Sequence, residues 1–458
     1  VNVITRRAVA GSRLGARAGA GRYATGEATG AWDWTDGTTR AGVTLGHLQS
    51  DGYAIREDSD VERGYERNTL NAYAEKTRGD WRFGVRHWEA RGTAEYLGFA
   101  FPPAAPPPLD QDFTNRVTAF EAGYDAAHGL RSRFTLSRAE DDIRQNQSAD
   151  FAQTKRLAFD WQNDLDLGAH HTLTVGLYRS AEDAATETFG APIDEQTDVN
   201  ALYLQDQWRD GRHTAVLAAR ATDHETFGRH TSWNADYGYA LGGATRLTLG
   251  AGRGFRAPDA TDLYSPFCGN PALEPEIARN AEAGLRHDFG GRHMLRGSLF
   301  AMDIDDLIVA VFDPVTFECE MRNLERARIR GLELAYSYVV DAWRIETEAI
   351  WQDPENRDTG RQLARRAERS FTARALRRFG DLEVGADLLA TSARPDSDFS
   401  TTINAGYVLT NLTARYRLAP ALALSARLEN VFDTDYVTAA GYRNPGRSLF
   451  VALEYRGE

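Results

Sequence analysis

Apolar and polar residues alternate with a period of two along most of this chain, and this pattern limits the fold more than any other feature. The segments 172–177, 332–338, 382–388, 422–428 and 449–455 each follow it. Because successive side chains of a β-strand point to opposite faces, the pattern predicts strands throughout. One face of these strands is apolar, while the other carries charges at a density that a dry core does not accept.

Composition excludes several classes of protein. Hydrophobic residues make up 42% and aromatic residues 10% of the 458 residues, which is too much for a disordered chain. A net charge of −13 argues against a nucleic acid as partner, since such binders carry basic surfaces. Two cysteines are too few for a small disulfide-rich domain.

The chain contains no apolar run near the roughly 18 residues that a transmembrane helix needs. Its densest apolar run, 307–312, is far shorter. The opening residues lack the apolar centre of a signal peptide, and the first residue is not methionine. We therefore expect that the chain begins inside a longer precursor or was cut.

Two kinds of connection separate the expected strands. Glycine-containing dipeptides typical of tight hairpin turns occur at 36–37, 79–80, 128–129, 210–211, 242–243, 290–291 and 380–381. Longer polar segments occur at about 50–66, 96–112, 187–195, 257–274, 313–322, 354–362 and 396–407. Because the two kinds alternate, we expect an up-and-down meander with tight turns at one rim and long loops at the other.

The number of segments indicates about 22 strands, which fits the length at roughly 10 residues per spanning strand plus its connection. We predict an all-β fold, a transmembrane up-and-down antiparallel β-barrel with its apolar face in lipid and its charged face lining a wet lumen. Closure would leave no exposed strand edges. The alternative is a soluble all-β repeat protein. Six tryptophans suit interfacial girdles or ordinary packing: Trp81, Trp88, Trp161, Trp208, Trp233 and Trp343.

Three segments resemble the TonB-dependent outer-membrane receptors. Residues 254–264 and 269–276 are similar to the signature loop of that family, and residues 428–447 to its last hairpin. Residues 1–7 resemble the last strand of its plug domain. The resemblance implies a plug strand and linker at 1–10 and a barrel at 11–458. It also implies the outer membrane of a Gram-negative bacterium, contact with outer-membrane lipid, short periplasmic turns and long extracellular loops.

Within the family, the segments 227–233, 327–333 and 363–367 are most similar to cobalamin transporters. This resemblance implies an active importer of a large scarce nutrient, above all cobalamin or a related corrinoid. Energy would come from TonB–ExbB–ExbD through a plug of which this sequence holds only the last strand. A ferric-siderophore receptor is the alternative within the family. A passive porin-like channel or an outer-membrane enzyme is the alternative outside it.

No catalytic residue is predicted, since the histidines lack metal-ligand spacing and no Gly-x-Ser-x-Gly motif occurs. The candidate ligand-binding residues are Asp262, Tyr264, Phe267 and Asn270, which offer aromatic and amide contacts; the alternative is a structural role for this loop. Cys268 and Cys319 lie in successive long loops, where an oxidising surface favours a disulfide over two free thiols.

No cofactor is required, but calcium is a candidate. Cobalamin transporters hold calcium with loop aspartates, and hard cations need several oxygen ligands. The candidate calcium ligands are Asp110, Asp112, Asp141, Asp142 and Asp194. The alternative is a set of solvated acidic loops. A further charged group, expected to form ion pairs in the lumen or to bind an anionic ligand, consists of Arg361, Arg365, Arg366 and Arg369.

Overall fold

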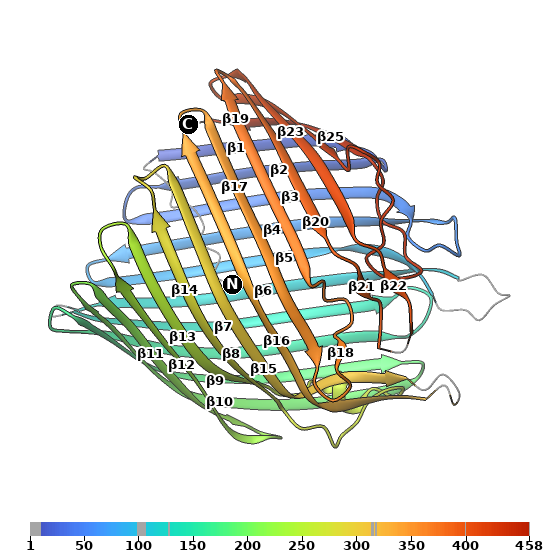
Figure 1. Cartoon of the computed structure of the whole chain (residues 1–458), viewed down its shortest axis with the longest axis horizontal. Helices are drawn as coiled ribbons and strands as arrows, with labels where there is room; N and C mark the ends of the chain where they lie inside the picture. Colours follow the sequence, from blue (N-terminus) through green and yellow to red (C-terminus); the bar gives the residue numbers. More distant parts are fainter. Residues whose placement is uncertain are drawn as a thin grey trace.

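The computed structural model describes residues 11–98, 107–126, 129–312, 316, 318–398 and 400–457. These residues form a closed antiparallel barrel of 22 strands, so the predicted fold class is confirmed (Figure 1). No helix among them is long and apolar enough to cross a membrane. The predicted plug strand at 1–10 lies outside the described residues.

The barrel strands follow one another in chain order. They are β1 (Gly11–Gly21), β2 (Thr25–Thr35), β3 (Thr39–Ala54), β4 (Glu62–Arg78), β5 (Trp81–Leu97), β6 (Pro108–Asp125), β7 (Leu130–Gln145), β8 (Phe151–Leu167), β9 (His171–Thr188), β10 (Ala191–Asp210), β11 (His213–His224), β12 (Gly228–Ala240), β13 (Thr245–Arg256), β14 (Glu276–Asp288), β15 (His293–Phe312), β16 (Cys319–Val340), β17 (Trp343–Asn356), β19 (Arg369–Phe379), β20 (Leu382–Thr391), β23 (Tyr407–Ala419), β24 (Leu422–Glu429) and β25 (Ser448–Arg456).

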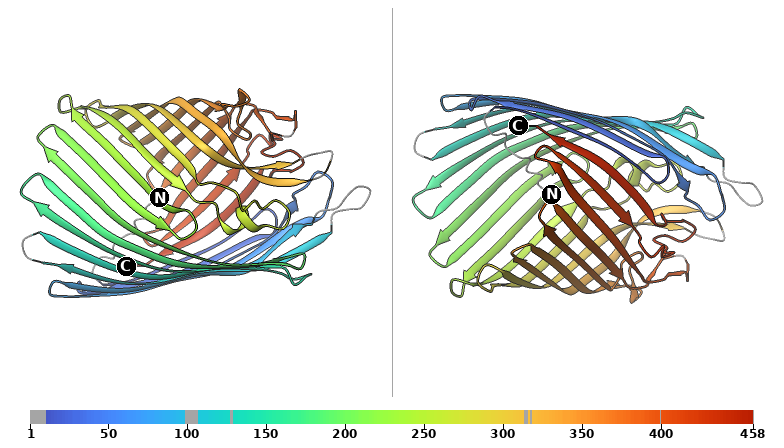
Figure 2. Two further views of the ribbon diagram at one scale, coloured as in Figure 1. Left: turned by 90° about the horizontal axis from the view of Figure 1, so that it is seen from below. Right: turned by 90° about the horizontal axis from the view of Figure 1, so that it is seen from above.

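Four short elements lie in the connections between barrel strands. They are the helix α1 (Ala260–Tyr264) and the two-residue strands β18 (Arg361–Gln362), β21 (Arg394–Pro395) and β22 (Ile403–Asn404). The longer connections gather at one end of the barrel and the tight turns at the other (Figure 2). By the family resemblance, the end with the longer connections is extracellular, and we call it the rim.

The tight turns are built by local hydrogen bonds and left-handed backbone. At the turn between β2 and β3, Gly37 has φ +90°. The Asp36 carboxylate accepts hydrogen bonds from the backbone N–H groups of Thr39 (2.5 Å) and Thr38 (2.8 Å). These bonds stabilise the charged carboxylate, so they lower the pKa of Asp36 to about 2.

One predicted loop is wrong. Residues 187–195 do not form a long connection, because β9 continues to Thr188 and β10 begins at Ala191. Phe189 (φ +50°) and Gly190 (φ +79°) alone make the turn. Two successive residues with positive φ match the right-handed twist of a hairpin. The polar residues of this segment therefore belong to the ends of two paired strands.

Register shows which face of the wall each side chain occupies, since directly opposed residues share a face. Five of the six tryptophans named above share the face of the exposed leucines, which is the lipid face of a membrane barrel. Trp88 is the exception. It lies opposite Asn71, whereas Val85, three residues earlier, lies opposite Ala74 on the other face. Trp88 therefore points into the lumen and belongs to no girdle.

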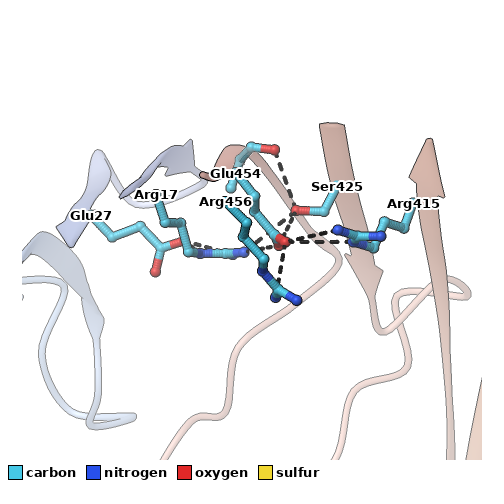
Figure 3. Close-up of polar contacts among 7 residues, drawn as sticks. Arg17, Glu27, Arg415, Ser425, Glu454 and Arg456 are labelled. Atoms are coloured by element: carbon cyan, nitrogen blue, oxygen red, sulfur yellow. Dashed lines mark hydrogen bonds and ion pairs between the residues drawn. The ribbon is translucent and has the colours of Figure 1, made fainter. Parts of the chain in front are cut away.

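Closure of the barrel brings the first and last strands together, and a polar cluster spans this seam. β1 pairs with β25 from Gly15↔Arg456 to Gly21↔Phe450. On the lumen face, Glu454 accepts hydrogen bonds from Arg17 (2.6 Å) and Arg415 (3.4 Å) and lies 3.5 Å from Arg456 (Figure 3). One carboxylate thus joins strands β1, β23 and β25.

We expect Glu454→Gln to lower the free energy of unfolding by about 1–2 kcal/mol, because three guanidinium groups lose their shared negative charge. The arginines are partly exposed, which limits the loss. Denaturant unfolding in detergent measures it. The matched control is Glu75→Gln, since Glu75 is also 14% exposed but has a single arginine partner, Arg40. Equal losses of stability in the two variants would contradict the larger contribution expected of Glu454 at the seam.

Candidate ligand-binding site

The connection between β13 and β14 is the most structured part of the rim. It opens with α1, whose N-cap Asp259 accepts a hydrogen bond from the backbone N–H of Asp262 (2.9 Å). The Asp262 carboxylate in turn accepts the N–H of Asp259 (3.2 Å), completing a capping box. Arg256, the last residue of β13, pairs with Asp262 (3.1 Å) and with Glu276 (2.9 Å), the first residue of β14.

A small apolar core lies beneath this connection. Leu263 of α1, Leu273 and Ile308 are each less than 9% exposed, and Phe227 and Met321 pack against them. These residues come from four different segments of the chain. Burying them together fixes the connection against its neighbours without help from a ligand.

Polar ties and a disulfide fasten the same connection to β16. Cys268 and Cys319 form a disulfide, with their sulfur atoms 2.02 Å apart. The Asn270 amide donates a hydrogen bond to the Met321 carbonyl (2.8 Å). The Asn323 amide donates to the Glu274 carbonyl (2.9 Å) and accepts the N–H of the same residue (2.9 Å). The connection is therefore held rigidly before any ligand arrives.

The four predicted ligand-binding residues divide into two pairs. Asp262 and Asn270 are engaged in the helix cap, the ion pair and the loop hydrogen bonds described above, which is the structural alternative for this loop. Tyr264 is 36% exposed and Phe267 is 57% exposed. The second pair is thus the one with side chains free to meet a ligand.

Sequence reasoning missed a third aromatic residue of the rim. Phe189, at the turn between β9 and β10, is 82% exposed, and its ring meets that of Phe267 edge-to-face at 5.5 Å. A phenylalanine with positive φ is uncommon, and such strain often marks a functional position. The sequence signal that could have found it is the dipeptide Phe189-Gly190, because glycine is typical of a tight turn.

A cavity of about 290 Å³ lies below α1, on the lumen face of β8, β9 and β10. Its lining includes Arg156, Tyr178, Glu182, Glu195, His224 and Tyr264. Arg156 and Glu182 are paired within it (2.6 Å). The cavity therefore offers phenol, imidazole and carboxylate groups to a polar part of a ligand, beside the aromatic residues above.

The other side of the rim is held by polar contacts between loops. The Arg443 guanidinium donates hydrogen bonds to the carbonyls of Glu57 (3.1 Å) and Ser59 (3.2 Å). Asp396 accepts the amide of Asn404 (2.9 Å) and the N–H of Ala440 (2.8 Å). Burial acts to raise the pKa of Asp396, but these hydrogen bonds and nearby arginines outweigh it and lower the pKa.

The structure does not bring the five candidate calcium ligands together. Asp141 lies opposite Asn115 on the lumen face of β7, whereas its neighbour Asp142 lies opposite Thr114 on the outward face. Asp194 is on β10, separated from β7 by β8 and β9. Asp110 and Asp112 accept hydrogen bonds from Gln147 (2.8 Å) and Thr93 (2.6 Å).

Among the described residues, no group of three or more His, Cys, Asp or Glu side chains is arranged to hold a metal. Calcium binding therefore stays a prediction without an assembled ligand set. The expected lumen position of the arginine group is wrong for Arg369, which lies opposite Trp351 on the outward face. Arg365 instead lies 3.8 Å from Asp396 in the rim.

Residues 9–431 match the family described as "TonB dependent receptor-like, beta-barrel". The chain belongs to this family. TonB-dependent receptors are outer-membrane receptors and transporters of Gram-negative bacteria and not enzymes. Members take up large ligands with energy coupled through TonB.

Two curated members are similar over most of the chain. The vitamin B12 transporter BtuB of Vibrio vulnificus is 25% identical over 92% of this chain and 70% of its own length. The vitamin B12 transporter BtuB of Photobacterium profundum is 26% identical over 89% of this chain and 68% of its own length.

Solved structures of the family share the barrel at lower identity. The FrpB iron transporter from Neisseria meningitidis is 12% identical, with a TM-score of 0.82 over 98% of this chain and 81% of its own. A ferric enterobactin receptor, PfeA, is 14% identical, with a TM-score of 0.83 over 99% of this chain and 82% of its own. These likenesses show the fold alone.

Proposed function

We propose that this TonB-dependent barrel imports cobalamin or a related corrinoid. The supporting observation is the similarity to two vitamin B12 transporters along about nine tenths of the chain. Ligand would bind at the rim over the loop between β13 and β14, and TonB–ExbB–ExbD would supply energy through a plug. The solved iron and enterobactin relatives make a ferric siderophore the rival ligand.

The rim has the features that such a ligand needs. A corrinoid is large and presents both a flat conjugated ring and polar amide groups. The exposed rings of Phe189 and Phe267 offer apolar contact, and the adjoining cavity offers polar groups. Because the disulfide and the loop hydrogen bonds hold this surface in place, little conformational entropy is lost when a ligand binds.

The test is equilibrium binding of cyanocobalamin and of a panel of ferric siderophores to the protein as its gene encodes it, purified in detergent. We expect cyanocobalamin to bind and the siderophores not to bind. Siderophore binding without cyanocobalamin binding would overturn the proposed ligand. Repeating the titration with calcium and with a chelator shows whether calcium strengthens binding, which is the remaining expectation for the rim aspartates.

We expect Phe189→Ala to weaken cyanocobalamin binding about tenfold, because an aromatic contact of the site is lost. The matched control is Phe432→Ala. Phe432 is 74% exposed in the connection after β24, but it has no ring contact with Phe267 among the described residues. Equal loss of affinity in the two variants would show that the rings of Phe189 and Phe267 are not part of the ligand-binding site.

A further inference from the structure

The outward face of the wall from β13 to β19 carries a belt of arginines. Arg253 lies opposite Arg279, Arg279 opposite Asp303, and Asp303 opposite Arg328. Leu299 of β15 lies opposite Leu332 of β16. Each is an even number of residues from Asp303 or Arg328 on its own strand, so these leucines share the outward face with the arginines. We name the arginine belt as the outward residues Arg253, Arg279, Arg328, Arg330 and Arg369.

The belt lies at the upper edge of the apolar band. Trp351 of β17 shares its row with Arg369, and it follows Trp343, at the tight-turn end, by eight residues. At about 3.3 Å per residue and a tilt of about 40°, this places Trp351 roughly 20 Å above that end. An outer-membrane barrel has an apolar band about 25 Å tall, flanked by aromatic girdles. The belt therefore faces the headgroups of the outer leaflet.

Acidic side chains neutralise only part of the belt. Arg279 pairs with Asp305, Arg328 with Asp303 (2.6 Å) and Arg330 with Asp353 (2.9 Å). Within the part of the chain that the structure describes, Arg253 and Arg369 make no ion pair, and the Arg253 guanidinium donates a hydrogen bond to the neutral Thr231 carbonyl. Two guanidinium groups thus keep uncompensated positive charge where lipid headgroups lie.

Two apolar grooves reach up to the belt on either side of Trp351. One, of about 850 Å³, has a lining that includes Ala281, Ala283, Leu299, Ala301 and Trp351 together with Arg330, Arg369 and the acidic residues Glu282, Asp353 and Glu368. The other, of about 920 Å³, includes Ala349, Trp351, Arg369, Phe371, Ala390 and Val408. Alanines between larger side chains make the grooves, and each ends at an arginine. Leu299 is 60% and Trp351 45% exposed, so the described parts of the barrel leave these grooves open to the outside.

We propose that this wall binds a phosphorylated glycolipid of the outer leaflet, with acyl chains in the two grooves and phosphates on the arginine belt. Arginine is suited to phosphate because its planar fork donates paired hydrogen bonds. The apolar grooves below require a ligand that joins an anionic head to hydrocarbon tails, which neither a peptide nor a free anion does. This lipid site is separate from the rim, so the proposal does not depend on whether cobalamin is the transported ligand.

The experiment titrates bisphosphoryl lipid A and dephosphorylated lipid A against the purified protein in detergent, with bound lipid counted by native mass spectrometry. We expect the bisphosphoryl form to bind more tightly. We expect Arg253→Gln and Arg369→Gln to weaken its binding about fivefold each and the double variant about 25-fold. The dephosphorylated form should respond to neither substitution.

The control variant is Arg179→Gln. Arg179 also lies on the outward face, opposite Phe159, and follows the start of β9 by eight residues, but it pairs with Asp198 (3.1 Å) of the adjacent strand β10 and lies outside the wall from β13 to β19. Far-ultraviolet circular dichroism establishes that each variant is folded. Equal binding of the two lipids, equal loss in Arg179→Gln, or full competition by inorganic phosphate would overturn the proposal.

Discussion

Replacing Cys268 and Cys319 together by serine should lower the free energy of unfolding by up to about 4 kcal/mol. The two cysteines are 51 residues apart, and closing a loop of that length restricts the unfolded chain. The loss should appear as a lower denaturant midpoint in detergent, with a steeper slope because the unfolded chain without the cross-link exposes more surface. Adding a reductant to the unsubstituted protein should reproduce it.

The same double variant should lose less than tenfold in ligand affinity. The hydrogen bonds from Asn270 to Met321 and between Asn323 and Glu274 do not depend on the disulfide. They should keep the connection seated in the folded protein, so that the disulfide acts mainly on the unfolded state. Asn323→Ala is the complementary variant, since it leaves the disulfide and removes the hydrogen bonds between Asn323 and Glu274. A larger loss of affinity in the serine variant than in Asn323→Ala would contradict this division.

Period and turn chemistry were sufficient to predict the architecture. Alternation identified strands such as 422–428 and 449–455, and the glycine dipeptides identified the tight turns. Both signals are local, because a strand's two faces and a turn's positive φ are properties of neighbouring residues. The up-and-down order then follows, since antiparallel neighbours need only short connections.

Assignments that depend on register could not be made from the same signals. Asp141 and Asp142 are adjacent in sequence and both acidic, yet they occupy opposite faces of the wall. For the same reason Arg369, expected in the lumen, lies on the outward face, and Trp88, a girdle candidate, lies in the lumen, since a shift of one residue exchanges the two faces. The face of a residue in an irregularly alternating strand is decided by its partners in neighbouring strands.

The candidate site shows a second limit. Composition showed that the loop at 257–274 is rich in aromatic and polar side chains. It did not show which of these side chains make contacts within the loop and which remain free for a ligand. Asp262 caps a helix and pairs with Arg256, while Phe267 remains open. Phe189 joins Phe267 from a hairpin that lies far away in sequence. Such a contact depends on how far the β9–β10 turn and the β13–β14 connection extend toward each other, which no local sequence pattern predicts.

The close packing of β4 against β5 leads to the second large expected effect. A Cβ atom added at Gly92 would lie 1.8 Å from the backbone oxygen of Glu66. Backbone cannot turn away as a flexible side chain does, so the two strands would have to separate. We expect Gly92→Ala to cost about 3 kcal/mol and to reduce the fraction of chains that fold into detergent micelles.

Gly30 provides the matched control for Gly92→Ala. It also lies within a barrel strand, but a Cβ atom there would meet nothing within 4 Å. We expect Gly30→Ala to change the free energy of unfolding by less than about 0.5 kcal/mol. The shift in gel mobility between heated and unheated samples measures the folded fraction, and denaturant unfolding measures stability. If both alanines were tolerated equally, the barrel wall would be more deformable at β4 and β5 than this backbone contact implies, and register there would have to be set by the adjoining turn at Gly79-Asp80.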